Sequence, residues 1–326
     1  MAGTWPTRRD PVPILLATGD AALVWAVGHD IQGEAPDAKS LWKLAPVLRI
    51  LRAQNRDGSW AYRGGSSPLR SSENYNQLAT YKQLLVLVSI YRLDRRHPAL
   101  ARAAEFLLGF QTPAGDIRGI SGNQYSPYYT ADMLRLLIEA GFGADRRVLR
   151  GMKWLVSVRQ DDGGWAIPFR TIAGAGSFAR VMTRPQPFEP DRARPSSHFV
   201  TGIVLRALGA HPRYRHRPEA KRAAALLAAR FFKADPYPDR ADAAYWTKLA
   251  FPFRWTDLVS ALDAIALVGL GVENAHVSDA LNWLIRHQRK DGLWRSGYGT
   301  TRDPLVHHWV TFAVARMLGR FFVEGG

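Results

Sequence analysis

The chain has 326 residues, no cysteine and a formal net charge of +16. The missing cysteine excludes disulfides, thiolate metal sites and cysteine nucleophiles. The longest apolar run, residues 84–90, is far shorter than the roughly 20 residues that a membrane-spanning helix needs. We therefore expect a globular cytoplasmic protein, in which any membrane contact is limited to the surface.

The basic excess favours an anionic partner, because cationic surfaces attract nucleic acids, anionic lipids and phosphorylated small molecules. Arginines are scattered along the chain, and the sequence has neither a lysine-rich tail nor a helix with a basic recognition face. Nucleic acid is therefore the weakest of these candidates, and a diphosphate or a membrane surface is favoured. A solvated basic exterior without a partner explains the charge equally well.

The predicted elements are all helices, because apolar residues recur at helical spacing and no segment alternates with a period of two. After residues 1–12, which we expect to be flexible, they cover residues 20–31, 40–53, 73–93, 98–110, 127–142, 146–158, 197–208, 218–232, 255–270, 276–287 and 307–318. Pro98 and Pro218 suit a first helical turn, and Ser40 suits an N-cap. Amphipathic segments alternate with more apolar ones, so we expect hairpins of one outer and one buried helix.

A short motif recurs inside these hairpins. It reads LRAQNRDGSW at residues 51–60, WLVSVRQDDGGW at 154–165 and WLIRHQRKDGLW at 283–294. A weaker copy at 106–117 keeps Gln111 and lacks the tryptophan, and a degenerate copy at 223–237 keeps only its helix. Gly permits a tight turn, the Gln amide can satisfy free backbone groups, and Trp packs on the neighbouring hairpin. We interpret the motif as a joint between hairpins.

This Gln…Asp-Gly-x-Trp motif resembles the repeat of the terpene cyclase and prenyltransferase superfamily, of the squalene-hopene cyclase and protein prenyltransferase β-subunit type. The resemblance spans about residues 50–320. It implies an all-α fold, an (α/α)6 toroid formed by residues 1–326 as a single domain. In such a toroid an inner and an outer ring of helices surround an apolar central cavity for isoprenoids. An open solenoid of the same hairpins is the alternative.

The motifs that carry the family's chemistry are missing. The chain has neither Asp-x-Asp-Asp nor Asp-Asp-x-x-Asp, and without cysteine it cannot form the usual zinc site of prenyltransferases. The resemblance implies an isoprenoid-handling enzyme, terpene cyclase-like or prenyltransferase-like, that acts on a polyprenyl chain or diphosphate. A non-catalytic toroid that binds a lipid or a partner is one alternative. A carbohydrate-active toroid is another, since aromatic and carboxylate side chains also suit sugars.

In a closed ring the inner helices run parallel, so their amino ends meet at one mouth, where their dipoles favour anions. A carboxylic acid buried there keeps its proton to higher pH and can act as a general acid, while aromatic rings stabilise carbocations. The candidate catalytic residues are Asp257, the first choice, with Asp132, Glu73 and His198. The candidate substrate-binding residues are Asn74, Tyr75, Tyr128, Tyr129, Arg254, Trp255, His307, His308 and Trp309. Helix capping is the alternative explanation for the polar ones.

Two imidazoles and a carboxylate could hold a divalent metal, zinc or magnesium, without cysteine. The candidate ligands are His198, Asp257 and His308. The resemblance supports His308 or its neighbour His307, because the family's zinc histidine lies at the start of the last inner helix. Tandem histidines that cap a helix or line a pocket are the alternative.

Two long loops could border the mouth. Residues 166–195 carry five arginines and could form a lid that contacts a diphosphate. Residues 234–254 hold Tyr237, Tyr245 and Trp246 together with Lys248 and Arg254, and they could form a rim that admits a lipid with a charged head. A solvated surface loop is the alternative for each.

Overall fold

The computed structural model describes residues 6–65, 67–298 and 303–322. Within these ranges the regular elements are helices, and β pairing is limited to isolated bridges. The prediction of an all-α fold is therefore confirmed. None of the described helices combines the length and hydropathy that a bilayer span requires.

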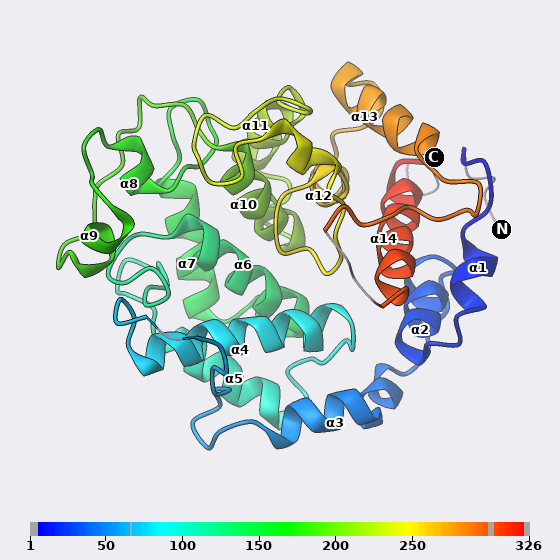
Figure 1. Cartoon of the computed structure of the whole chain (residues 1–326), viewed down its shortest axis with the longest axis horizontal. Helices are drawn as coiled ribbons and strands as arrows, with labels where there is room; N and C mark the ends of the chain where they lie inside the picture. The colour runs from blue at the N-terminus through cyan, green and yellow to red at the C-terminus, as the bar shows by residue number, and fades with distance from the viewer. Residues whose placement is uncertain (1–5, 66, 299–302, 323–326) are drawn as a thin grey trace.

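Twelve of the described helices form six consecutive hairpins, each with an outer and an inner member. The outer helices are α1 (Val12–Leu16), α3 (Ala45–Arg52), α5 (Pro98–Leu108), α7 (Arg146–Ser157), α11 (Pro218–Ala228) and α13 (Ala275–Arg286). The inner helices are α2 (Ala21–Asp30), α4 (Ser72–Ser89), α6 (Pro127–Leu137), α10 (His198–Ala210), α12 (Leu258–Val268) and α14 (Leu305–Phe322). Figure 1 shows the described helices running once around the molecule, so that α1 and α14 lie side by side.

Shorter elements lie in the connections. Between hairpins are η1 (Ala38–Lys43) and η2 (Ile138–Phe142), and within hairpins are α8 (Pro168–Thr171), α9 (Phe178–Thr183) and η3 (Ala243–Thr247). Pro98 and Pro218 open α5 and α11 as predicted. The prediction that Ser40 caps a helix is wrong, because Ser40 lies within the 3₁₀ helix η1 and the N-cap of α3 is Leu44. Pro46 in the first turn of α3 favours this later start.

The ring is closed by contacts between the first and last hairpins. Helix α10 packs against α6 and α12, α12 against α14, and α14 against α2. A buried cluster completes the circle, because it joins α2 to Ile90 at the end of α4 and to Trp309 and Phe312 of α14. The chain is thus an (α/α)6 toroid, and the open solenoid is excluded.

A second closure links the last joint to the N-terminal segment. The Gln288 amide accepts a hydrogen bond from the Arg9 backbone N–H at 3.1 Å and donates one to the Arg9 carbonyl at 2.8 Å. Arg9 lies in the segment that we expect to be flexible, of which residues 1–5 lie outside the described residues. From Arg9 onward the segment therefore has a specific attachment to the ring.

The repeated motif is a joint, as predicted, and the glutamine connects one hairpin to the next. The Gln54 amide donates to the Gly58 carbonyl in its own turn at 3.0 Å and to the Ala99 carbonyl of the next outer helix at 2.7 Å. Gln111 repeats this pattern with Gly115 and Arg147, at 2.9 and 2.8 Å. Gly58 has φ +89°, and a Cβ there would meet the Arg102 carbonyl at 2.3 Å. Only glycine suits both conditions.

The tryptophan of each joint reaches back to its own outer helix. The indole N–H groups of Trp60, Trp165 and Trp294 donate to the carbonyls of Ile50, Leu155 and Leu284, at 2.7, 2.7 and 2.8 Å. Their backbone N–H groups donate to buried threonines of the following inner helix, Thr80, Thr201 and Thr311, at 3.0 Å each. The degenerate copy has a substitute, since the buried Trp246 donates to the Lys233 carbonyl at 3.0 Å.

Candidate functional site

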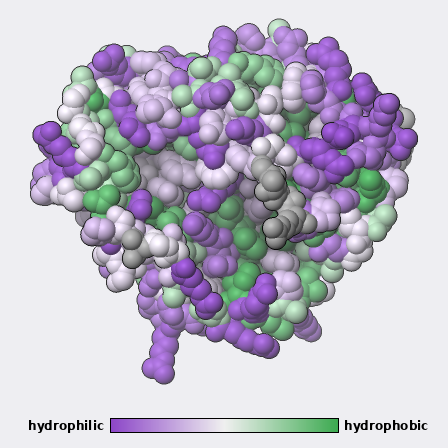
Figure 2. Space-filling model, viewed as in Figure 1, coloured by the Kyte–Doolittle hydropathy of each residue, from purple (hydrophilic) through white to green (hydrophobic). Residues whose placement is uncertain are grey.

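Several predicted substrate-binding residues gather where the amino ends of α6 and α12 meet α4. The rings of Tyr128 and Tyr129 lie 4.3 Å apart, and Tyr128 lies 5.5 Å from the ring of Phe199 on α10. Arg254 lies close to these tyrosines. Burial raises the pKa of Tyr128, and the positive charge of Arg254 opposes that rise. We call Tyr128, Tyr129, Arg254, Trp255 and Lys82 the amino mouth. Figure 2 shows a hollow near the centre of the face seen in Figure 1, with polar and apolar residues side by side.

Two cations of the amino mouth have no acidic partner among the described residues. Burial lowers the pKa of Lys82, and repulsion from Arg254 lowers it further. The buried Nε of Arg254 has no hydrogen-bond partner in the part of the chain that the structure describes. Lys82 was not predicted, since its helix reads as an ordinary buried one. The mouth therefore carries positive charge that protein carboxylates leave uncompensated.

A third cation covers the tryptophan of the mouth. The Arg240 guanidinium lies 3.6 Å from the centroid of Trp255 and 4.6 Å from that of Tyr245. Arg240 also donates to the Tyr298 hydroxyl at 2.7 Å. Residues 234–254 thus supply aromatic and cationic groups beside the mouth, although no motif marks Arg240 or Tyr298.

Asp257, the first-choice acid, is the N-cap of α12 and is 2% exposed. Its Oδ1 accepts from the Ser260 N–H at 2.8 Å, and its Oδ2 accepts from the Ala250 N–H at 2.9 Å. Burial raises the pKa of Asp257 to about 6, although these hydrogen bonds oppose the shift. The side chain can hold a proton near neutral pH, but both of its oxygens serve the fold. Its role as a general acid stays a prediction.

Asp132 and Glu73 occupy opposite environments. Asp132 is fully buried, where it accepts from the Tyr81 hydroxyl at 2.5 Å and from Arg135 Nε at 2.8 Å. Burial, and then the neighbouring Asp132, raise the pKa of Tyr81 well above its usual value. Glu73 lies exposed in the first turn of α4. Neither carboxyl therefore has the environment of an acid in an apolar cavity, and their catalytic roles stay predictions.

Asn74 and Tyr75 lie at the start of α4. The backbone N–H of Asn74 donates to the capping Ser71 hydroxyl at 3.1 Å. The Tyr75 hydroxyl accepts from the Ser67 N–H at 2.6 Å, and its ring stacks on Tyr62 at 4.8 Å. These contacts order the loop before α4, and a substrate-binding role stays a prediction for both residues.

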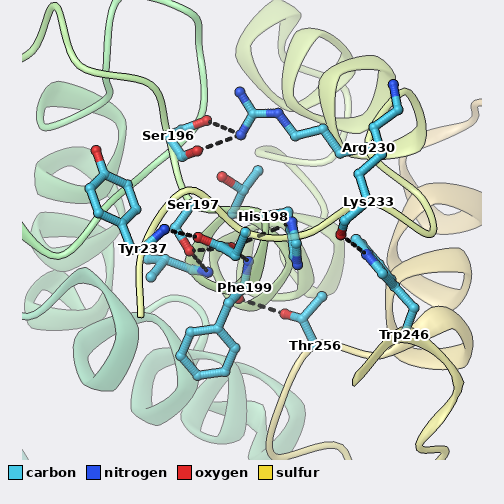
Figure 3. A network of polar contacts seen from close by, with 12 residues as sticks. Ser196, Ser197, His198, Phe199, Arg230, Lys233, Tyr237, Trp246 and Thr256 are labelled. Carbon is cyan, nitrogen blue, oxygen red and sulfur yellow. Dashed lines mark hydrogen bonds and ion pairs between the residues drawn. The ribbon is translucent and has the colours of Figure 1, made fainter. Parts of the chain in front are cut away.

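His198 belongs to a buried network at the start of α10 (Figure 3). Its Nδ1 lies 3.4 Å from Asp235 Oδ2, and its ring packs on Trp246 at 4.6 Å. The same Asp235 oxygen accepts from the Ser197 hydroxyl at 2.8 Å and from the Phe199 N–H at 3.0 Å. Burial lowers the pKa of His198, and Asp235 opposes this. The network ties α10 to residues 235–246.

The three candidate residues at the start of α14, His307, His308 and Trp309, have different surroundings. His307 Nδ1 accepts from the Ser296 N–H at 3.2 Å, and the His308 Nδ1–H donates to the Pro304 carbonyl at 3.1 Å. Trp309 is buried and stacks on Phe251 at 5.6 Å. His307 thus supports the last joint, His308 bonds a backbone carbonyl at the start of α14, and Trp309 packs in the core.

The candidate metal ligands are not found together in the part of the chain that the structure describes. The described residues contain no group of three His, Asp or Glu side chains that could hold a metal ion. His198 pairs with Asp235, Asp257 caps α12, and His308 faces the Pro304 carbonyl. Each of these ligand candidates is therefore used locally, and the three are not brought together for zinc or magnesium.

The centre of the ring is filled from the mouth side. Phe253 is 5% exposed, and its carbonyl accepts from Arg135 Nη2 at 3.3 Å. The Trp255 carbonyl accepts from Arg206 Nη1 at 3.1 Å. We call residues 251–256 the central loop. Through these contacts with α6 and α10, the loop takes up part of the space inside the inner helices, where the resemblance implies an apolar cavity.

The main cavity lies beyond the central loop, at the carboxyl ends of the inner helices. It has a volume of about 800 Å³ and receives residues from all six inner helices. Its wall is polar as well as apolar, since it includes seven arginines beside Phe251, Phe253 and Trp25. We call it the carboxyl cavity. Its arginines are far apart in the sequence, and each one alone resembles an ordinary helix-end cation, so no motif marks the site.

Residues 166–195 are not a structureless loop. They form α8 and α9, and Figure 1 places both at the outer edge of the ring, beside α7. Arg170 pairs with Asp239 at 2.7 Å, and Glu189 accepts from the Tyr125 hydroxyl at 2.9 Å. The segment also receives the Gln160 amide, which donates to the Asp191 carbonyl at 2.8 Å. In this structure it lies beside the mouth rather than over it, and its role as a lid stays a prediction.

No protein-family model and no curated protein matches the chain. Among solved structures, a protein from Actinoplanes shares 18% identity, with 87% of this chain and 99% of that chain covered and a TM-score of 0.32. The type II terpene cyclase MstE from Scytonema shares 15%, with 90% and 97% covered and a TM-score of 0.32. A polysaccharide lyase shares 10%, with 95% and 94% covered and a TM-score of 0.45. At TM-scores this low the similarities carry no argument about activity.

Proposed function

We propose that the chain is an isoprenoid-handling enzyme, terpene cyclase-like or prenyltransferase-like, that receives a prenyl diphosphate at the amino mouth. The observation that carries this proposal is a pair of neighbouring cations without acidic partners among the described residues, Lys82 and Arg254. Arg254 lies beside the adjoining rings of Tyr128 and Tyr129. The resemblance of the joints to the terpene cyclase and prenyltransferase repeat supports the same substrate class.

The charged head of such a substrate suits the mouth for two reasons. The amino ends of the inner helices carry partial positive charge, which favours anions. Burial, and then repulsion from Arg254, lower the pKa of Lys82, and an anion between the two side chains would relieve that repulsion. A diphosphate offers several acceptor oxygens for both side chains.

The apolar tail suits the aromatic wall. Tyr128 contacts both Tyr129 and Phe199, and the ring of Tyr129 meets Tyr81 edge to face at 5.9 Å. Aromatic faces bind hydrocarbon and stabilise positive charge that develops on carbon. A sugar would stack less well on Trp255, because the Arg240 guanidinium already covers that ring.

The acid in this proposal is Asp257. Protonation of an alkene needs a carboxylic acid that keeps its proton near neutral pH, and the pKa of Asp257 is raised to about 6. To donate that proton to a substrate, Asp257 would have to break the hydrogen bond that its Oδ2 accepts from the Ala250 N–H. The proposal therefore includes a shift of the segment before α12 when substrate binds.

Calorimetric titration with farnesyl and geranylgeranyl diphosphate, followed by product analysis, tests the proposal. We expect saturable binding that the double variant Lys82→Met/Arg254→Met weakens at least about tenfold, as for lost charge-assisted hydrogen bonds. The matched control is Lys290→Met, an exposed residue of the last joint, which should bind as the wild type does.

Three outcomes would count against the proposal. Absence of binding would remove the mouth as a prenyl diphosphate site. Binding without turnover of any isoprenoid would favour the non-catalytic toroid. Turnover of an oligosaccharide in place of isoprenoids would favour the carbohydrate-active alternative.

A further inference from the structure

The carboxyl cavity concentrates side-chain donors that have no acceptor. Among the described residues, ten buried side-chain nitrogen or oxygen atoms lack a hydrogen-bond partner. Seven belong to residues that line this cavity: Trp25 Nε1, Ser89 Oγ, Arg92 Nε, Arg206 Nε, Arg206 Nη2, Arg215 Nε and Arg316 Nε. Six of these are N–H groups, which only donate. Buried donors without acceptors are costly, so their concentration points to acceptor atoms supplied by a ligand.

Arg206 is the most enclosed of these donors. Its side chain is 3% exposed, and only Nη1 is used, by the Trp255 carbonyl. The closest carboxylate to Nη2 is that of Asp132, at 3.9 Å, which is beyond hydrogen-bond reach. Burial lowers the pKa of Arg206, and Asp132 opposes that shift. The guanidinium therefore lies in the cavity wall with its charge incompletely compensated.

The other walls add further positive charge. The cavity lining has seven arginines and five carboxylates, so 7 − 5 leaves a formal charge of +2. Arg215, just after α10, forms no ion pair with any residue in the described ranges, and its buried Nε has no partner. Arg316 lies 3.4 Å from Asp263 and 3.6 Å from Asp30, longer than the roughly 2.7–2.9 Å of a strong charge-assisted hydrogen bond. Arg316 is therefore paired with two carboxylates over long distances, and its buried Nε still has no partner among the described residues.

Part of the lining is apolar. Phe251 and Phe253 of the central loop form one side, together with Leu267 of α12. The Arg316 guanidinium lies 5.6 Å from the centroids of both phenylalanine rings, so the charged and apolar parts adjoin. The volume of about 800 Å³ falls within the roughly 300–1,000 Å³ of small-molecule sites. It exceeds what an inorganic anion alone would fill.

We propose that the carboxyl cavity binds an organic phosphate or diphosphate. The oxyanion lies against Arg206, Arg215 and Arg316, and the organic part lies against Phe251 and Phe253. The donor set selects an anion, because guanidinium groups donate in a planar fork that matches phosphate oxygens. This site is separate from the amino mouth, because the central loop lies between them, and it does not depend on the proposed function.

Calorimetric titration with inorganic diphosphate tests the site. The titration uses the full chain carrying Lys82→Met/Arg254→Met, so that the amino mouth does not contribute. We expect one diphosphate per chain, and added Arg215→Ala to weaken binding about tenfold or more. Arg286→Ala, an exposed arginine of α13, is the matched control and should leave the affinity unchanged.

A second variant guards against loss of folding. Arg206→Lys keeps the charge of a buried residue but removes the planar fork, and circular dichroism checks that the chain stays folded. We expect it to weaken diphosphate binding as Arg215→Ala does. Arg215→Ala, which has no contact with the central loop in the described residues, should leave prenyl diphosphate binding at an intact amino mouth unchanged, and this separates a failure here from a failure of the proposed function.

Several outcomes would overturn the inference. One is that diphosphate shows no saturable binding when its titration is compared with a titration of chloride at equal ionic strength. Another is equal weakening by Arg286→Ala, which would show a general surface effect. Citrate binding more tightly than diphosphate would replace the phosphate assignment by a carboxylate one. A crystal structure grown with diphosphate that shows only water on Arg206 would show that water satisfies these donors.

Discussion

Arg206 of α10 donates a hydrogen bond of 3.1 Å to the main-chain carbonyl of Trp255, and so an inner-ring side chain holds the loop that fills the ring. Arg135 of α6 does the same for Phe253, at 3.3 Å. Both arginines are at most 4% exposed. The wall and the loop are thus one polar unit, which divides the interior into the amino mouth and the carboxyl cavity.

Removal of a buried side chain from the central loop should destabilise the whole ring. Phe253 is 5% exposed, so Phe253→Ala removes a buried ring and leaves a void, at a cost of about 3–5 kcal/mol in unfolding free energy. Urea denaturation measures the change. Phe178→Ala is the matched control, because Phe178 is 46% exposed and its loss should cost about 0.5 kcal/mol or less. Similar costs at the two positions would show that the central loop is not part of the core.

Asp257→Asn should change how stability depends on pH. The pKa of Asp257 is raised to about 6 in the folded chain from 3.8, so the folded state binds its proton more tightly. Its contribution to stability is therefore complete below pH 4 and is lost as pH rises through 6. Between pH 4 and pH 7 the variant should gain on the order of 2–3 kcal/mol relative to the wild type.

Denaturation at several pH values measures this difference. Asp279→Asn on α13 is the control, because Asp279 is exposed and its substitution should give a difference that is flat over the same range. A flat difference for Asp257→Asn as well would mean that Asp257 titrates normally, and it would remove the basis of its acid role.

The threonines that follow each joint should contribute to stability through one hydroxyl. Thr201 is 1% exposed and accepts from the Trp165 backbone N–H at 3.0 Å. Thr201→Val keeps the shape but leaves that N–H without an acceptor, which should cost about 1–3 kcal/mol. Thermal and urea unfolding measure the cost. The exposed Thr183→Val should change stability by about 0.5 kcal/mol at most, and a comparable loss there would contradict the joint explanation.

Gln288→Ala should loosen the ring at its closure. The substitution removes the acceptor of the Arg9 N–H and the donor to the Arg9 carbonyl. Amide exchange at Arg9 should accelerate, and limited proteolysis before α1 should become faster, while the other joints stay protected. Gln32→Ala, at an exposed position, is the control. Unchanged exchange at Arg9 would show that the N-terminal segment is held by other contacts.

The fold could be predicted because its determinants are local and repeated. The three full joints each carry their own glycine, glutamine and tryptophan, and the bonds of Gln54 and Trp60 stay within one hairpin and the start of the next. The helix boundaries follow equally local signals, such as Pro98 and Pro218. Ser40 failed as a cap because the competing Pro46 starts α3 later.

The candidate site was predicted only where helix starts define it. Helices α6 and α12 both pack against α10, and this brings Tyr128 and Tyr129 of α6 close to Arg254, just before α12. The central loop escaped prediction, because its place depends on carbonyl contacts with Arg135 and Arg206, which are far from it in sequence. The carboxyl cavity escaped for the same reason. Of the histidines considered for a metal site, His198 faces Asp235 and His308 donates to the Pro304 carbonyl.

The hydrogen bonds between Gln288 and Arg9 imply that the first and last hairpins are held as neighbours by side-chain and backbone contacts, independent of chain order. The toroid should therefore tolerate circular permutation. A chain whose original ends are joined by a flexible linker, and which opens at the exposed Val272 and Glu273 between α12 and α13, keeps every joint intact. It would present new termini on the carboxyl side of the ring, a few residues beyond Leu267 of the carboxyl cavity, at the opposite end of α12 from the amino mouth.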